Sequence, residues 1–135
     1  MKRGIWACVA CLVLYTLSNF FIHGVLLRPL YQQTPQLLRN AEDGAAHTPF
    51  LMLSFLVFTV AFVWIYAQGV EPKGWLGQGI RYGLAIWLIA TLSRYLVYYA
   101  IQPWPPAVVA AQVGLELVST LLVSVVLAAL YRKPA

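Results

Sequence analysis

Four long apolar stretches are the feature that most constrains how this chain can fold. They cover about residues 4–28, 49–69, 78–101 and 107–131. A helix needs about 20 mostly apolar residues to cross the hydrocarbon core of a bilayer, and each stretch is that long. Only 10% of all residues are charged, whereas a soluble domain has about 25%. We therefore expect an all-α fold, in which residues 1–135 form one integral membrane four-helix bundle.

The basic residues indicate how such a bundle would be oriented. The net charge is +5, and most of the basic residues lie near the ends of the apolar stretches. Six of them can lie on one side: Lys2, Arg3, Lys73, Arg81, Arg132 and Lys133. The positive-inside rule then places both termini in the cytoplasm. The expected partner is the lipid bilayer rather than a nucleic acid. The first apolar run is too long for a signal-peptide core, so we expect it to be retained.

Two charged residues lie far from the ends of apolar stretches, Arg94 in the third and Glu116 in the fourth. An ionised side chain in hydrocarbon is costly, so it usually faces the protein interior and has a partner. A rise of ~1.5 Å per residue places Arg94 and Glu116 roughly 12 and 15 Å from the outer surface. Because their charges are opposite and their depths similar, we predict an intramembrane ion pair that joins the last two helices.

Further polar residues extend this layer. Asn19 and His23 share one helix face, as do Arg94 and Tyr98, because each pair has i, i+4 spacing. Gln112 lies four residues before Glu116 in the same way. Ser54 in the second stretch reaches a similar level. The candidate polar cluster, and the candidate ligand-binding site, is therefore Arg94, Glu116, His23, Asn19, Tyr98 and Gln112.

The chain also contains a weak internal repeat. The segment Thr16–His23 aligns without gaps with Thr91–Tyr98. If this similarity is real, the protein consists of two tandem helical hairpins in parallel orientation, and Asn19 is equivalent to Arg94. The alternative is that aromatic-rich apolar helices align by chance.

Two interpretations of the polar cluster remain open. In the first, the side chains fix how the helices pack, and the protein has a structural or accessory role as a homo-oligomer or within a larger membrane complex. In the second, the protein is a small transporter or binding protein for an anionic or amphiphilic ligand. Arg94 would then bind the anion, Glu116 or His23 would exchange protons, and tyrosines and Trp104 would line the entrance. Alternatively, Arg94 extends to the outer headgroups and leaves Glu116 unpaired.

Other chemistry finds little support in the residues. Cys8 and Cys11 form a C-x-x-C motif within apolar sequence, where small apolar packing explains them better than redox chemistry. His23 and His47 are expected at different depths, which argues against a haem. The sequence has no set of ligands spaced for zinc and no nucleophile or phosphate-loop motif. We therefore expect no cofactor and no metal, and an enzyme is the less favoured class.

Three short motifs resemble segments of small four-helix bacterial membrane proteins to which no activity is assigned. They are Asn19-Phe20-x-x-His23, Gly74-Trp75-x-Gly77-x-Gly79 and Tyr98-x-x-x-Gln102-Pro103-x-Pro105. The resemblance implies a bacterial inner membrane location and transfers no role to any residue.

Overall fold

The computed structural model describes residues 2–132, which form helices and no strand. The elements are α1 (Lys2–Phe21), the π-helix η1 (Ile22–Leu26), α2 (Arg28–Tyr31), the 3-10 helix η2 (Pro35–Leu37), α3 (Ala41–Gly69), α4 (Trp75–Ile86), the π-helix η3 (Trp87–Leu92), α5 (Ser93–Ile101) and α6 (Pro106–Tyr131). α1 continues into η1, and α4, η3 and α5 form one continuous helix. The structure therefore contains four helices that are each long enough and apolar enough to cross a membrane. The all-α prediction is confirmed.

The connection between the first two long helices differs from the prediction. A loop was expected over about residues 29–48, but α3 begins at Ala41. The Asn40 side chain caps this start by accepting a hydrogen bond of 2.9 Å from the Asp43 backbone N–H, and two acidic residues occupy the first turn. Both features stabilise a helix N-terminus. Pro49, the first residue of the second long apolar stretch, lies inside the helix. Within this connection, Pro35–Leu37 form the 3-10 helix η2.

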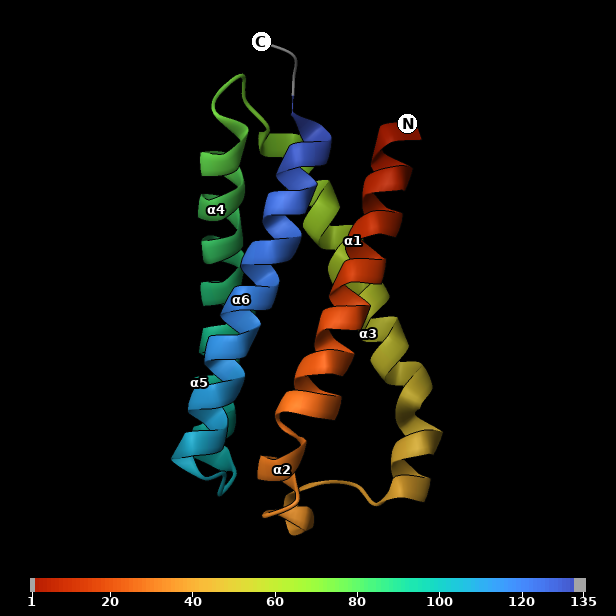
Figure 1. The fold of residues 1–135 in the computed structure, drawn as a ribbon, viewed down its shortest axis with the longest axis vertical. Coiled ribbons are helices and arrows are strands. Elements are labelled where there is room, and N and C mark those ends of the chain that lie inside the picture. The colour runs from red at the N-terminus through yellow and green to blue at the C-terminus, as the bar shows by residue number, and fades with distance from the viewer. Residues whose placement is uncertain (1, 133–135) are drawn as a thin grey trace.

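The four long helices converge at one end and separate at the other. α1 packs against both α3 and α6, and α4 packs along α6 (Figure 1). The start of α1 lies beside the end of α6, because the Arg3 guanidinium donates to the backbone carbonyl oxygens of Leu130 and Arg132 at 2.7 and 2.5 Å. At the opposite end, the first half of α3 lies away from the other helices (Figure 1).

Two glycines allow the close approach of α4 and α6. A Cβ atom at Gly79 would lie 2.8 Å from the Ala128 Cβ, and one at Gly83 would lie 2.2 Å from the Ser124 Oγ. Both distances are shorter than van der Waals contact, so a larger residue would force the helices apart. The Gly79-x-x-x-Gly83 spacing thus has the packing role that small residues have between membrane helices.

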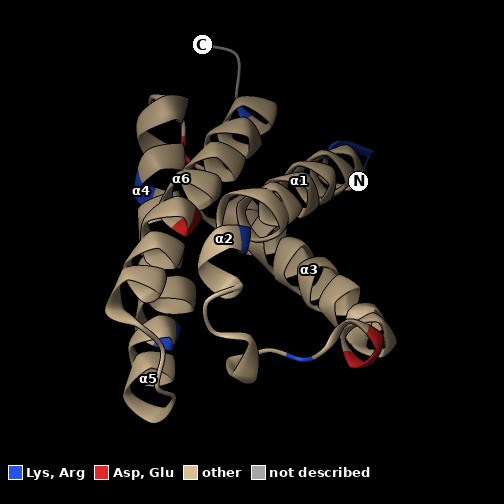
Figure 2. Cartoon of the chain, turned by 60° about the horizontal axis from the view of Figure 1, so that its bottom comes forward, with Lys and Arg blue, Asp and Glu red and all other residues tan. Residues whose placement is uncertain are grey.

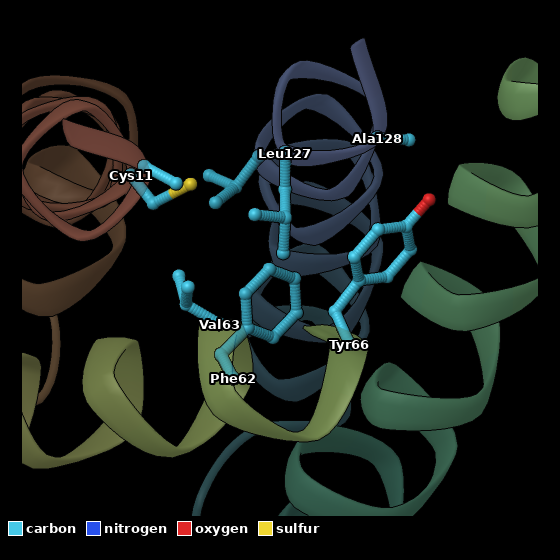
Figure 3. Packing of buried hydrophobic residues seen from close by; sticks show 8 residues of the cluster. Cys11, Phe62, Val63, Tyr66, Leu127 and Ala128 are labelled. Carbon is cyan, nitrogen blue, oxygen red and sulfur yellow. The ribbon is translucent and has the colours of Figure 1, made fainter. Parts of the chain in front are cut away.

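The main hydrophobic cluster lies at the convergent end. Cys11 of α1 points toward Leu127 of α6, with Val63 and Phe62 of α3 below them (Figure 3). The Tyr82 hydroxyl of α4 adds a hydrogen bond of 2.5 Å to the Phe62 backbone oxygen. All four long helices therefore contribute to this cluster, which holds one end of the molecule together. A second, smaller cluster around Trp104, Val108 and Val109 lies near the other end.

Candidate functional site

A hydrogen-bonded network of four side chains joins the beginning of the chain to its last helix. The His23 Nε2 lies 2.9 Å from the Glu116 Oε1, and the His23 Nδ1 lies 2.6 Å from the Tyr31 hydroxyl. The Gln112 amide donates to the same hydroxyl at 3.0 Å. The Glu116 side chain is only 8% exposed, whereas that of His23 is 31% exposed. The network therefore runs from a buried carboxylate to a partly accessible imidazole and phenol.

Local departures from α-helical geometry accompany two of the site residues. His23 lies within the π-helix η1, and η3 ends at Leu92, just before Arg94. A π turn holds more residues than an α turn, so it rotates the side chains that follow relative to the preceding helix. Such turns occur often at functional sites. Here His23 lies within one π turn and Arg94 follows the other, and both residues line the same cavity.

The predicted ion pair between Arg94 and Glu116 is absent. Arg94 is exposed on α5, and the ion-pair partner of Glu116 is His23. Equal depth did not bring the two charges together, because the contact that forms depends on which way each helix face points. Within residues 2–132, Arg94 has no ion pair.

Arg94 instead lines a cavity of about 610 Å³. The walls come from η1, α2, α5, α6 and the connections α2–α3 and α5–α6. They consist of His23, Tyr31, Leu38, Arg94, Tyr95, Val97, Tyr98, Ile101, Gln102, Trp104 and Gln112. Aromatic and aliphatic side chains predominate. Pockets of about 300–1,000 Å³ with apolar walls and a few polar groups are typical of small-molecule sites.

One polar atom of the cavity wall has no partner. Gln112 is 4% exposed, and its Oε1 atom is buried without a hydrogen bond. A buried polar atom without a partner costs about 1–3 kcal/mol. A donor from a ligand in the cavity would remove that cost.

Tyr31 is a site residue that is absent from the predicted polar cluster. Burial raises the pKa of its hydroxyl, so the group stays protonated at neutral pH. Its ring packs edge-on against Trp104, whose indole N–H donates to the Gln102 side chain at 2.9 Å. Tyr31 stands eight residues after His23 in a short helix that forms only after the π turn. Its aromatic character was visible in the sequence, but no spacing rule connected it to His23.

The other predicted members of the cluster are placed differently. Tyr98 lines the cavity and stacks on Trp104 at 5.3 Å between ring centres. Asn19 is buried, but its amide donates to the Tyr15 backbone oxygen of its own helix. Ser54 is exposed and bonded within α3, so α3 does not contribute it to a shared polar layer.

A separate polar contact links α1 and α6 beyond the cavity. The Ser18 and Ser119 hydroxyls lie 2.7 Å apart. Such contacts between helices contribute about 0.6 kcal/mol on average in membranes. Together with His23 and Glu116, they fix the relative position of the first and last long helices.

The remaining candidate groups lie outside the cavity. Cys8 and Cys11 are free thiols, and Cys11 is buried in the main hydrophobic cluster. His47 contacts Asp43 at the start of α3 and has no contact with His23. In the part of the chain that the structure describes, no group of three or more His, Cys, Asp or Glu could hold a metal ion. The internal repeat stays a prediction, although η1 and η3 fall at positions that its alignment does not equate.

Comparisons with known protein families, with curated proteins and with solved structures give no match. The functional interpretation therefore depends on the geometry of the cavity and its network.

Proposed function

We propose that this protein is an integral membrane protein that binds an amphiphile with an anionic headgroup in the cavity between α1–α2 and α5–α6. The observation that carries the proposal is the position of Arg94. Arg94 lines a mainly apolar cavity and has no ion pair among the described residues. An arginine that is not neutralised by the protein suits a carboxylate, sulfate or phosphate group.

The membrane part of the proposal is supported by the surface. Large apolar side chains point outward from every long helix, among them Trp6 at 71%, Phe50 at 69%, Ile89 at 73% and Val118 at 65% exposure. Charged residues occupy only short parts of the helices (Figure 2). Such a surface is costly in water but suits hydrocarbon.

The orientation follows from the basic residues. Arg3, Lys73 and Arg132 belong to the convergent end, where α1 begins, the α3–α4 turn lies and α6 ends. Lys133 lies outside the described residues. The positive-inside rule would place this end in the cytoplasm and the cavity toward the opposite surface. A bacterial inner membrane is the location that the resemblance described above implies.

The rim of the cavity favours a ligand that arrives from the bilayer. Val97 and Ile101 line the cavity and are 57% and 76% exposed on α5. An acyl chain could therefore remain in contact with lipid while its headgroup reaches Arg94. The site differs from the sequence-based hypothesis, because Glu116 is hydrogen-bonded to His23 and makes no contact with Arg94.

The proposal is tested with the arginine variant Arg94→Gln. We expect anionic amphiphiles to co-purify with the wild-type protein in a mild detergent, as measured by native mass spectrometry and lipid analysis. Loss of a charged hydrogen bond costs about 1.5–3 kcal/mol, so Arg94→Gln should weaken binding roughly 10- to 150-fold. Arg81→Gln is the matched control, because Arg81 is another exposed arginine on the same continuous helix but lies outside this cavity. Equal binding by the two variants would refute the proposal.

A structural role is the second candidate, and the contacts between α1 and α6 favour it. His23–Glu116 and Ser18–Ser119 both span these helices, so the polar groups contribute to assembly whether or not a ligand binds. In this case the protein would act as an accessory subunit in a homo-oligomer or larger membrane complex. A wild-type protein that retains no amphiphile, but remains associated with other subunits after gentle extraction, would favour this candidate.

A further inference from the structure

When His23 is neutral and Glu116 is ionised, the hydrogen bonds of the network have only one consistent set of directions. The Gln112 Nε2 donates to the Tyr31 oxygen, so the Tyr31 proton is free to be donated to the His23 Nδ1. The imidazole proton then resides on Nε2 and is donated to the Glu116 carboxylate. Each donor has an acceptor, and the Tyr31 hydroxyl is directed away from the ligand.

Protonation of His23 reverses one of these bonds. An imidazolium carries a proton on both nitrogens, so Nδ1 becomes a donor to the Tyr31 oxygen. That oxygen then accepts from both His23 and Gln112, and its own proton has lost its acceptor. Because Tyr31 lines the same cavity as Arg94, the freed O–H can be donated to an anion there. The Glu116 carboxylate remains in place to stabilise the imidazolium.

We propose that the cavity binds its anionic ligand together with one proton, which is held by His23. Charge balance gives the reason. Arg94 and Glu116 carry opposite charges, so an incoming monoanion leaves the site with a net charge of −1 unless a proton accompanies it. Protonation of His23 restores neutrality and supplies the Tyr31 donor at the same time. This inference rests on the proposed function and adds proton coupling to it.

The surrounding groups single out His23 as the proton acceptor. The titratable or charged groups that face it or share its cavity are Glu116 of α6, Tyr31 of α2, and Arg94, Tyr95 and Tyr98 of α5. On its own helix, Asn19 one turn earlier is uncharged. Histidine is the side chain whose ordinary pKa, about 6.5, lies in the physiological range. Glu116 is the competing acceptor, and the experiment must separate the two.

The test uses an anion that does not itself titrate. We would measure the binding of 1-decanesulfonate to the full chain in phosphatidylcholine nanodiscs by calorimetry, with empty nanodiscs as the control for partitioning. Wherever binding takes up a proton, the affinity rises as the pH falls. We therefore expect about tenfold tighter binding near pH 5.5 than near pH 8. A tenfold change over 2.5 pH units corresponds to an average uptake of about 0.4 protons per sulfonate, which buffers of different ionisation enthalpy should reveal.

Two histidine variants locate the proton. His23→Gln keeps an N–H donor for Glu116 but cannot become charged, so its affinity should not depend on pH. His47→Gln should behave like the wild type, because His47 lies at the start of α3 outside the cavity. In the His47→Gln protein His23 is the only histidine. Its ring ¹⁵N shifts then report protonation directly, with and without the sulfonate, even if His23→Gln does not fold.

The possible results separate the inference from the function beneath it. Binding with the same affinity at both pH values and without proton uptake would overturn proton coupling and leave the binding function intact. Proton uptake without a change in the His23 ring shifts would also overturn the inference, because Glu116 would then be the acceptor. A wild-type protein that binds no sulfonate at either pH would overturn both proposals.

Discussion

Replacing Gly79 by alanine should loosen the packing of α4 against α6. The added Cβ would lie 2.8 Å from the Ala128 Cβ, 3.0 Å from the Ser124 backbone oxygen and 3.3 Å from the Val125 Cα. Two of these neighbours are backbone atoms, which cannot move aside as a flexible side chain can. Overpacking in a well-packed interior costs about 1–3 kcal/mol. The helix itself would gain about 0.5–1 kcal/mol from the removal of a glycine, so the net loss should be about 0–2.5 kcal/mol.

Gly114 provides a matched control within the same pair of helices. It lies inside α6, and a Cβ there would meet no atom within 4 Å. Gly114→Ala should therefore stabilise the protein by about 0.5–1 kcal/mol, since only the propensity gain remains. The difference between the two variants isolates the overpacking cost of about 1–3 kcal/mol.

Equilibrium unfolding in mixed micelles of a mild detergent and SDS measures this difference as a free energy. Both variants should retain their helical circular dichroism before the transition. If Gly79→Ala proves as stable as Gly114→Ala, the close contact between α4 and α6 does not exist in the folded protein, and the packing described here is wrong.

Three further perturbations have defined outcomes. Glu116→Leu removes the acceptor for the His23 Nε2 and should destabilise the protein by about 1 kcal/mol. This value is the lower end of the range for a polar group left without a partner, because His23 is partly exposed. Unfolding in SDS would measure the loss of stability. Cys11 has 0% exposure, so a maleimide should label it only after unfolding, which mass spectrometry of labelled peptides would detect. A hydrogen bond from Lys73 lowers the pKa of Glu71, so Lys73→Gln should raise that pKa toward its usual value, as measured by NMR titration. Since the folded pKa is depressed, any stability from this exposed pair is present above the unfolded pKa and is lost as the pH falls through the folded one.

The long helices were predictable because an apolar stretch of about 20 residues is the length of a membrane-spanning helix and is much longer than a β-strand. The residues at which these helices begin and end were harder to predict. The first two turns of α3 are polar, and hydropathy cannot distinguish them from a loop; the Asn40 cap and the acidic first turn were the available signals. Proline is unfavourable in the interior of a helix, yet α3 continues through Pro49.

The candidate site was predictable as a set of polar residues but not as a set of contacts. Composition identified His23, Arg94, Gln112 and Glu116, since polar groups in apolar stretches are rare. The pairing was wrong because helix order in the sequence favours neighbours, while Glu116 contacts a residue of the first long helix. The π turns change the direction of His23 and Arg94, and no simple periodicity predicts where such turns occur.

The contact between His23 and Glu116 has a consequence for how the protein is made. The two residues are 93 positions apart, and they belong to the first and last long helices. At about 5–20 residues per second, His23 is synthesised roughly 5–20 s before its partner. During that interval the first hairpin carries polar side chains whose final acceptors do not yet exist. Synthesis of the last helix is thus the step that supplies the partner of the His23 Nε2 atom.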